Sequence, residues 1–467
     1  MALGLHKRNL IDITGDHLLN IEKLAERIAG YDFTYHIITY GCQMNVHDSE
    51  KLAGMLENIG YSQTGDKNSA DIILFNTCCV RDHAEQRVYG NIGMLKEQKL
   101  KNPNLLIGVC GCMMQQNGVA EGIAKKFPFV DLVFGTHNLY EFPKLLLEAL
   151  DSANTIVEIS EHNDQKENIA SIKRNSGISA WVTIMYGCDN FCSYCIVPYV
   201  RGRERSRSRD EILTEINMLT LEGFKEAYLL GQNVNSYKGD NGYLFHDLLE
   251  DINKVKGIER IRFISSHPKD LSPKLIDAFE SCDKLCEHIH LPIQSGSNSV
   301  LEKMNRKYTR EDYLKLIDRI RNLSKRIAVT TDIIAGFPGE TENDFENTLS
   351  LLEEVRFDAA FTFMYSPRKG TPAAELADQT EHHVKKGRLD LLNKTQAEIS
   401  KKINQKYEDR VFEVMVEGAS KNNADMFSGR TRTNKLVNFR AEDLLPGYMA
   451  NVRITHSKAW TLEGVIV

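Results

Sequence analysis

The sequence predicts an α/β protein with two successive regions of parallel β-sheet and a small all-β domain at the carboxyl end. Short apolar runs alternate with helical patterns in both regions, which is typical of parallel sheets flanked by helices. The carboxyl-terminal residues instead form short strand-like runs separated by turns. The chain has 467 residues, of which 42% are hydrophobic and 26% charged. Its length and composition predict about three globular domains.

The first region, predicted as residues 33–150, repeats a strand followed by a helix. The apolar runs YHIITYGC, DIILFNTC and LLIGVCGC end at Cys42, Cys78 and Cys112, and the run DLVFG begins at Asp131. Their spacing of about 35 residues predicts a doubly wound parallel sheet. Because such a sheet places the carboxyl ends of its strands at one edge, we expect the three cysteines to converge there.

A polar stretch at 151–177 predicts a linker that includes one short strand. The second region, predicted as residues 174–404, contains six further strand-like runs: WVTIMYGC, EAYLLGQN, RIRFISSHP, HIHLPIQSGS, AVTTDIIAGFPG and AAFTFMYSPRKGT. Six strand–helix units predict a partial (βα)6 barrel with its chemistry at the carboxyl ends of the strands. The amphipathic run from His382 to Arg410 predicts a long helix after it.

The last domain, predicted as residues 407–467, has a different sequence pattern from the two regions before it. Its short strand-like runs are VFEVMVEG, MFSGRT, KLVNF, YMANVRITHS and TLEGVIV, with turns between them. This pattern predicts a small β-barrel, an architecture that often binds nucleic acid.

Composition and charge narrow the class of protein. The net charge of −6 argues against a general polyanion binder, but the windows Arg201–Arg209 and Lys421–Arg440 are locally basic. Each window is either an ordinary solvated face or a nucleic-acid surface. No apolar run is long enough for a membrane span, and the first residues lack the apolar core of a signal peptide. We therefore expect a cytoplasmic protein with no membrane partner. Metal or catalytic thiols explain its ten cysteines better than disulfides do.

Three cysteines lie close together at Cys188, Cys192 and Cys195. A structural zinc site normally has four protein ligands, and no fourth ligand lies nearby in the sequence. Three thiolates suit a 4Fe–4S cluster in which one iron stays open for another ligand. The alternative is a zinc knuckle or a chance grouping.

With Tyr194 before its last cysteine, this CxxxCxxC motif resembles that of the radical S-adenosylmethionine (SAM) superfamily. The resemblance implies that SAM binds the open iron through its amino and carboxylate groups. It also implies that an electron from the reduced cluster cleaves the sulfonium and yields a 5′-deoxyadenosyl radical. We expect further cofactor contacts at Tyr194, Arg203, Gln232, Asn233, Ser265 and Gly336.

These contacts rest on the sequence at later strand ends. Gln232 and Asn233 lie in GQNVNSY, where the superfamily places a methionine-binding segment, and SSHP offers Ser265 and Ser266 as ribose or carboxylate partners. Gly336 in DIIAGFPGE leaves room for the adenosyl group, although a strand followed by a Pro-Gly turn explains the same residues. Arg203 pairs with the cofactor carboxylate or faces RNA.

The first region adds a second resemblance. The motifs TYGCQMNVHDSE, FNTCCVRDHAEQR and CGCMMQ are similar to those of the radical SAM methylthiotransferase family, and the resemblance covers nearly the whole chain. It implies that Cys42, Cys78 and Cys112 hold a second 4Fe–4S cluster, which delivers sulfur. Cys79 and Cys110 are then not ligands, because strand alternation places Cys79 opposite Cys78 and Cys110 lies inside a strand.

The motif YGCQMN…DSE is most similar to that of the branch of this family that acts on isopentenyl-type adenosine in tRNA. The implied reaction is methylthiolation of C2 of N6-(dimethylallyl)adenosine next to the anticodon. The implied partners of a monomer are the tRNA anticodon stem-loop and a flavodoxin- or ferredoxin-type electron donor. We expect Arg430, Arg432 and Lys435 to contact phosphates and Phe439 to stack on a base, unless this segment is an ordinary charged hairpin.

Three other functions stay open. Two other branches of the family act on threonylcarbamoyl-adenosine in tRNA and on a ribosomal protein. A different class is a non-enzymatic RNA-binding protein that holds zinc or an iron–sulfur cluster at the three clustered cysteines.

Overall fold

The computed structural model describes residues 15–79, 82–161, 172–174, 177–420 and 423–467. The chain divides into two compact units: unit 1 is Met1–Asn175 with Ile196–Gly202, and unit 2 is Ser176–Cys195 with Arg203–Val467. Part of the expected linker, 162–171 and 175–176, lies outside the described residues. The sequence placed 196–202 in the second region, whereas these residues pack with unit 1. The domain boundaries at 33–150, 174–404 and 407–467 stay predictions.

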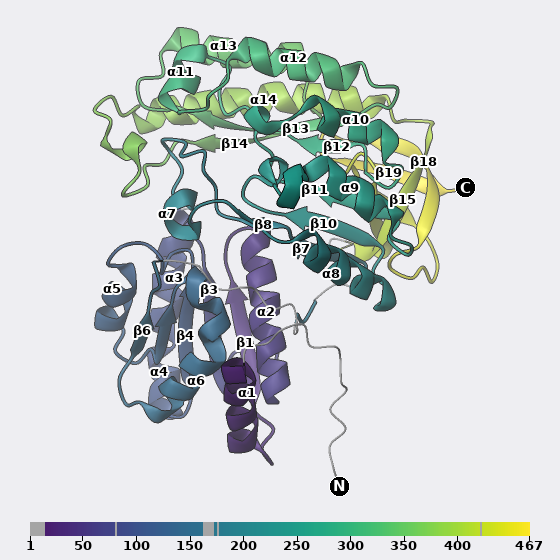
Figure 1. Ribbon diagram of the computed structural model, residues 1–467. Helices are drawn as coiled ribbons and strands as arrows, with labels where there is room; N and C mark the ends of the chain where they lie inside the picture. Colours follow the sequence, from purple (N-terminus) through teal and green to yellow (C-terminus); the bar gives the residue numbers. More distant parts are fainter. Residues whose placement is uncertain (1–14, 80–81, 162–171, 175–176, 421–422) are drawn as a thin grey trace. The chain divides into compact units, whose positions relative to one another are not determined.

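The described part of unit 1 contains a sheet of six parallel strands in the order β2-β1-β3-β4-β5-β6 (Figure 1). The strands are β1 Thr34–Thr39, β2 Ser62–Gln63, β3 Ile72–Thr77, β4 Leu106–Gly111, β5 Leu132–Phe134 and β6 Ile156–Glu158. The chain moves outward from β1 to β2 and then returns to β3 on the other side. The edge between β1 and β3 is therefore the topological switch point, where open parallel sheets bind ligands.

Helices cover both faces of this sheet because successive side chains of each buried strand point to opposite faces. Ile72 and Leu74 of β3 pack in one cluster with α1, α2 and α6, while Ile73 and Phe75 pack in another with α3 and α5. The doubly wound prediction is confirmed. The helical segments of unit 1 are α1 Gly15–Ile28, α2 Gln43–Ile59, α3 Asp82–Met94, α4 Lys96–Lys101, α5 Val119–Lys126, η1 Thr136–Glu141, α6 Phe142–Asp151 and α7 Val197–Arg201.

Unit 2 begins with a parallel βα arrangement. Its parallel strands are β7 Ser179–Thr183, β10 Glu226–Leu230, β11 Arg260–Phe263, β12 His288–His290, β13 Ala328–Ala335 and β14 Ala359–Met364. They form the sheets β11-β10-β7 and β12-β13-β14, and Ile261 of β11 makes an isolated parallel bridge to Leu285, which precedes β12. The predicted six-strand partial barrel is confirmed over these described strands. A short antiparallel ribbon, β8 Met185–Tyr186 with β9 Arg205–Ser206, flanks the loop that carries the clustered cysteines.

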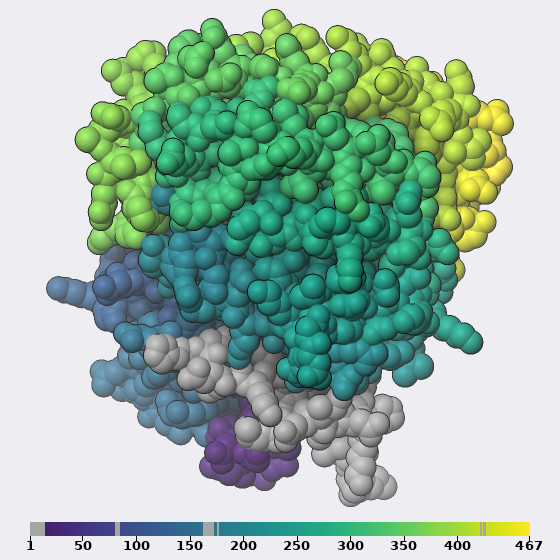
Figure 2. Space-filling model, turned by 45° about the horizontal axis from the view of Figure 1, so that its top comes forward, coloured from purple at the N-terminus to yellow at the C-terminus, as the bar shows by residue number. Residues whose placement is uncertain are grey.

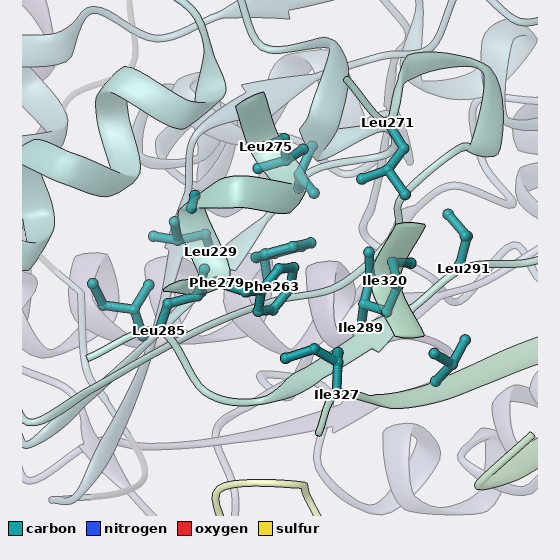
Figure 3. Packing of buried hydrophobic residues seen from close by; sticks show 14 of the residues in the cluster. Leu229, Phe263, Leu271, Leu275, Phe279, Leu285, Ile289, Leu291, Ile320 and Ile327 are labelled. Carbon is teal, nitrogen blue, oxygen red and sulfur yellow. The ribbon is translucent and has the colours of Figure 1, made fainter. Parts of the chain in front are cut away.

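A large apolar cluster forms the core between the barrel strands and their helices. Figure 3 shows Phe263 of β11 next to Phe279 of α10, with Leu229 and Leu275 close by. The two rings lie 6.0 Å apart and both are almost fully buried. The helical segments around this core are α8 Arg209–Leu221, η2 Val234–Ser236, η3 Asp240–Gly242, α9 Phe245–Lys254, η4 Pro268–Asp270, α10 Pro273–Ser281, α11 Asn298–Lys303, α12 Arg310–Arg321, α13 Glu342–Val355, η5 Pro372–Glu375 and α14 His382–Gln405.

The carboxyl-terminal strands close into a barrel in the order β15-β16-β17-β19-β18. They are β15 Val411–Ser420, β16 Asn423–Thr431, β17 Leu436–Arg440, β18 Met449–Ser457 and β19 Thr461–Ile466. Alternate side chains such as Val414, Val437 and Ile454 are fully buried inside it. The predicted small β-barrel is confirmed. In Figure 2 its yellow atoms lie beside the green atoms of unit 2.

Buried arginines join this barrel to the rest of unit 2. The fully buried Arg260 of β11 pairs with Glu413 at 2.7 Å and donates to the carbonyl of Arg430. Arg262, on the same face of β11, pairs with Glu226 at 2.6 Å and donates to the carbonyl of Thr431. Each guanidinium bonds both a carboxylate and backbone carbonyls of the barrel. The contact therefore depends on where these carbonyls lie as well as on charge.

Among the described residues, no helix combines the length and the apolar character that crossing a membrane requires.

Phe263→Ala tests the barrel core. Removing this nearly fully buried ring leaves a cavity, and we expect the free energy of unfolding to fall by about 3–5 kcal/mol. Urea unfolding followed by circular dichroism measures the change. Phe361→Ala is the matched control, because the Phe361 ring is 56% exposed and its loss costs less than about 1 kcal/mol. Equal effects of the two substitutions would contradict the described core.

Candidate active site

The three distant cysteines of unit 1 lie at the switch point of its sheet. Cys42 follows β1 and is the N-cap residue of α2, Cys78 directly follows β3, and Cys112 directly follows β4. Cys42 is exposed, whereas Cys78 and Cys112 are buried. The expectation that strand ends would bring these thiols to one edge agrees with this placement.

Asn45, in the first turn of α2, ties the three cysteine loops together. Its Nδ2 donates to the carbonyls of Tyr40 and Thr77 at 3.0 and 2.8 Å. Its Oδ1 accepts from the thiols of Cys42 and Cys112 at 3.8 and 3.7 Å. Asn45 is fully buried, so these bonds replace its contacts with water.

Glycines before two of these cysteines allow the close packing. Gly41 has φ of +111°, and a Cβ there would lie 2.5 Å from Cβ of Cys78. Gly111 has φ of +97°, and its Cβ would lie 2.5 Å from the carbonyl oxygen of Thr77. The repeated Gly-Cys pair is therefore a backbone requirement of the site. Gly187, before Cys188 in unit 2, also has a positive φ, of 73°.

Arg201, at the end of α7, also contacts these cysteine loops. Its Nε donates to Sγ of Cys112 at 3.1 Å, and its Nη2 lies 2.7 Å from Oδ2 of Asp48. A hydrogen bond with Cys79 and the charge of Arg201 lower the pKa of Cys112 to about 6. The thiolate is the form that binds metal, so this environment suits a ligand.

The two other cysteines of unit 1 differ from each other. Cys110 lies inside β4 in the apolar core, and burial raises the pKa of its thiol. Cys79 packs against Cys112 and hydrogen-bonds with it, and this bond together with burial raises the pKa of Cys79. The expectation that strand alternation directs Cys79 away from the site is wrong, because β3 ends at Thr77.

The cysteine loop of unit 2 runs from Gly187 to Cys195 and is held by the last residue of α11 and by residues that follow it. The Ser193 amide donates to the carbonyl of Met304, and the Ser193 hydroxyl donates to that of Lys303. Asn305 donates to the carbonyls of Asn190 and Phe191. The Asn190 side chain in turn donates to Sγ of Cys188 at 3.5 Å. The loop is thus anchored along its length.

Arg306 gives this loop a buried positive charge. Its Nη1 donates to Sγ of Cys192 and to the hydroxyl of Tyr194, both at 3.4 Å, and its other donors reach the carbonyl of Pro292 and the hydroxyl of Tyr308. Arg306 is 4% exposed, and its bonds within the described residues include no carboxylate. A buried guanidinium without a carboxylate partner favours an anionic group beside it, such as a set of thiolates.

Polar atoms collect at the carboxyl ends of the barrel strands in unit 2. Buried polar groups are nearly always hydrogen-bonded, so unpaired ones indicate a missing ligand or water. Within the described part of the chain, the buried atoms without a partner at these strand ends are Oε1 of Gln232, Oδ1 of Asn233, Oγ of Ser266, Nε2 of His267 and the hydroxyl of Tyr365. Burial holds the pKa of His267 at about 2, so its ring is neutral.

The expected cofactor contacts fall into two groups. Tyr194, Gln232 and Asn233 are at the cysteine loop or at a strand end with unpaired polar atoms. Arg203 is instead exposed and pairs with Asp189 at 3.2 Å. For Ser265 the described bond is made by its backbone carbonyl, which accepts from Val234.

Gly336 is required for a reason that the sequence did not indicate. It has φ of +70°, and a Cβ there would collide with the side chain of Lys385 from α14. Its amide donates to the carboxylate of Glu340 at 2.7 Å. Packing within unit 2 therefore accounts for the glycine without any cofactor.

The basic residues expected to bind RNA are largely engaged within unit 2. Arg432 pairs with Glu287 at 2.7 Å, and Lys435 pairs with the buried Asp358 at 3.2 Å. Arg430 pairs with Glu417 at 2.9 Å and stays about one-third exposed. Phosphate contacts by Arg432 and Lys435 would require these pairs to break. The expectation that Phe439 stacks on a base is wrong, because its ring is fully buried in the barrel.

Both cysteine sets fit iron–sulfur chemistry by their donors. Each offers three thiols with a guanidinium donating to one of them, which compensates the negative charge of thiolate ligands. No group of three His, Cys, Asp or Glu side chains in the described chain is arranged to bind a single metal ion. Clusters space their thiolates farther apart than one ion does, so the two observations are compatible.

Comparisons with known proteins match each part of the chain. Family models match residues 34–135 to "Uncharacterized protein family UPF0004", 182–352 to the "Radical SAM superfamily" and 405–467 to the "TRAM domain". The radical SAM methyltransferase TsrM from Kitasatospora setae, solved with cobalamin and a [4Fe-4S] cluster, is 14% identical with a TM-score of 0.55. The match covers 74% of this chain and 77% of that one, and it supports the fold. Fold and matches together define a radical SAM protein with a carboxyl-terminal TRAM domain.

Curated relatives narrow this class. Three proteins named "tRNA-2-methylthio-N(6)-dimethylallyladenosine synthase" are 56% identical in Acetivibrio thermocellus, 53% in Thermoanaerobacter sp. (strain X514) and 55% in Clostridium tetani. The matches cover 100%, 98% and 92% of this chain, and 100%, 98% and 96% of those proteins. The chain belongs to the family of tRNA-2-methylthio-N(6)-dimethylallyladenosine synthases.

Gly41→Ala tests the packing of the cysteine loops in unit 1. The substitution forces a Cβ into Cys78 at a left-handed φ, and we expect it to lower the free energy of unfolding by about 1–3 kcal/mol. We also expect less iron in unit 1 after anaerobic reconstitution, measured by a colorimetric iron assay. Gly122→Ala is the control, since a Cβ there meets nothing within 4 Å. Full iron content in Gly41→Ala would contradict the described loop geometry.

Proposed function

We propose that this protein methylthiolates C2 of N6-(dimethylallyl)adenosine next to the anticodon of tRNA, by radical C–H activation and sulfur insertion. The names of the relatives support the substrate. The observation that carries the reaction class is the anchored loop of Cys188, Cys192 and Cys195 with the buried Arg306 beside it. An unactivated aromatic C–H does not exchange at neutral pH, so a radical route is required.

In this proposal Cys188, Cys192 and Cys195 hold one 4Fe–4S cluster, and Cys42, Cys78 and Cys112 hold another. When bound, the first would supply the electron that cleaves one SAM into methionine and a 5′-deoxyadenosyl radical, which takes the C2 hydrogen. The second would hold the sulfur to be inserted, and another SAM would supply the methyl group. Arg306 compensates charge on the thiolate of Cys192, and Asn190 donates to that of Cys188. Both contacts keep the loop in one geometry while its charge changes.

The unpaired polar atoms at the strand ends of unit 2 are proposed to bind SAM. Oε1 of Gln232 and Oδ1 of Asn233 can accept from its amino group, and the neutral ring of His267 can donate. His267 accepts from the Lys269 amide at Nδ1, so Nε2 carries the proton. Tyr194, Ser265 and Gly336 are proposed to lie beside the cofactor, and Arg203 to contact either the cofactor or RNA.

The proposed partners are the tRNA anticodon stem-loop and a flavodoxin- or ferredoxin-type electron donor. The protein is proposed to be a monomer in the cytoplasm. The TRAM match and the names of the relatives support an RNA partner. Of the three barrel residues expected to contact phosphates, Arg430 is the one whose side chain stays accessible enough to reach a phosphate without losing a buried ion pair.

The substrate is tested with tRNA nucleosides from a deletion strain. We expect 2-methylthio-N6-dimethylallyladenosine to disappear and N6-dimethylallyladenosine to accumulate, as measured by mass spectrometry. Restoring the gene reverses both changes. Unchanged methylthiolation of this nucleoside, with loss of a methylthio group from threonylcarbamoyl-adenosine or a ribosomal protein, would overturn the proposal.

The two cysteine sets are separated by single substitutions in anaerobically reconstituted protein. We expect about eight irons per chain for two 4Fe–4S clusters and about four in a variant that lacks either set. Cys188→Ala abolishes SAM cleavage, because the radical-generating site is lost. Cys42→Ala leaves SAM cleavage measurable by 5′-deoxyadenosine release but stops sulfur insertion. Zinc in place of iron would favour a non-enzymatic RNA-binding protein.

Cys79→Ala and Cys110→Ala are the matched controls for these ligands. Both cysteines are buried in unit 1 like Cys112, yet neither is proposed to bind iron. We expect each variant to keep its full iron content. Loss of about four irons in Cys79→Ala would show that Cys79, which contacts Cys112, is a ligand.

A further inference from the structure

We propose that Arg201 is a positioning residue of the sulfur-carrying site in unit 1, and that it raises the reduction potential of the cluster held by Cys42, Cys78 and Cys112. This inference rests on the proposed function, because it requires that cluster. Arg201 lies in the basic window 201–209, for which the sequence left open either a solvated face or a nucleic-acid surface.

The contacts of Arg201 are specific and local. Nε donates to Sγ of Cys112 at 3.1 Å, and Nη2 donates to Oδ1 of Asn45 at 2.9 Å. Nη2 also lies 2.7 Å from Oδ2 of Asp48. Asn45 and Asp48 belong to α2, whose N-cap residue is Cys42. One guanidinium therefore bridges the loop after β4 to the helix that begins at another predicted ligand.

The surroundings hold Arg201 in this orientation. Its side chain is 8% exposed and that of Asp48 is 7% exposed, so bulk water screens neither charge effectively. Just before it in α7, Val200 packs on Cys79 and Cys112 in one apolar cluster with Ile196. The carbonyl of Val200 accepts from the hydroxyl of Thr136 at 2.8 Å. An arginine on the protein surface has no such constraints.

An N–H donor directed at a ligand sulfur stabilises the more negative, reduced state of a cluster. Asp48 opposes this effect because its carboxylate neutralises the guanidinium charge. The two residues therefore affect the potential in opposite directions. If the Arg201–Asp48 pair were only a structural salt bridge, loss of either partner would destabilise the fold. The two losses would not shift the reduction potential in opposite directions.

The test uses the full-length chain with Cys188, Cys192 and Cys195 replaced by Ala, so that only the unit 1 cluster forms. After anaerobic reconstitution, the potential is measured by redox titration followed by electron paramagnetic resonance. Arg201→Met keeps length and loses the donors, and we expect about a tenfold fall in the equilibrium constant for reduction, a potential lower by about 59 mV. Asp48→Asn leaves the guanidinium charge unopposed, and we expect a potential higher than that of the parent chain.

Arg27→Met is the matched control, because Arg27 is an exposed arginine of unit 1 that pairs with Asp151. We expect the cluster of the Arg27→Met variant to keep the reduction potential of the parent chain. If circular dichroism shows that Arg201→Met is folded but the variant loses iron, the positioning role of Arg201 is confirmed. The direction in which Asp48→Asn shifts the reduction potential then decides the electrostatic role.

The inference is overturned if Arg201→Met and Asp48→Asn both bind about four irons with the potential of Arg27→Met. It is also overturned if the two variants shift the potential in the same direction. The proposed function fails separately, and the inference with it, if the parent chain with Cys42, Cys78 and Cys112 intact takes up no iron.

Discussion

Parallel β-strands place all their carboxyl ends at one edge of a sheet, and both candidate sites depend on this constraint. In unit 1 it brings together Cys42, Cys78 and Cys112, which are far apart in the sequence. In unit 2 it places the polar ends of β10, β11 and β14 at one edge of the partial barrel. Side chains within the strands are committed to packing, so the residues just beyond them carry the chemistry.

A second feature recurs in both units. Each cysteine set has one buried arginine that donates to a thiol, Arg201 to Cys112 and Arg306 to Cys192. The two differ in their partners: Arg201 pairs with Asp48, whereas the described bonds of Arg306 include no carboxylate. A carboxylate therefore neutralises the guanidinium charge in one site, whereas in the other the described residues provide no carboxylate partner. Two iron–sulfur clusters of the same type, one in each of these sites, would differ in reduction potential.

The all-β domain shows how a basic sequence can mislead. Arg432 and Lys435 lie in a locally basic window, yet Glu287 and Asp358 neutralise them inside unit 2. Their carboxylate partners come from segments distant in sequence, so a local charge count overlooks them. Together with Arg260 and Arg262 of β11, these pairs join the barrel to the βα part of unit 2. Basic residues here serve mainly in assembling the unit.

The sequence alone determined the fold class, because the period of apolar residues and the spacing of turns are local properties. It also determined the clustered cysteines, since their spacing in CxxxCxxC needs no tertiary information. Only the tertiary structure revealed Arg306 beside Cys192, Arg201 beside Cys112, and Lys385 as the reason for Gly336. Each of these contacts joins residues that no periodicity relates, so packing of the whole chain decides it.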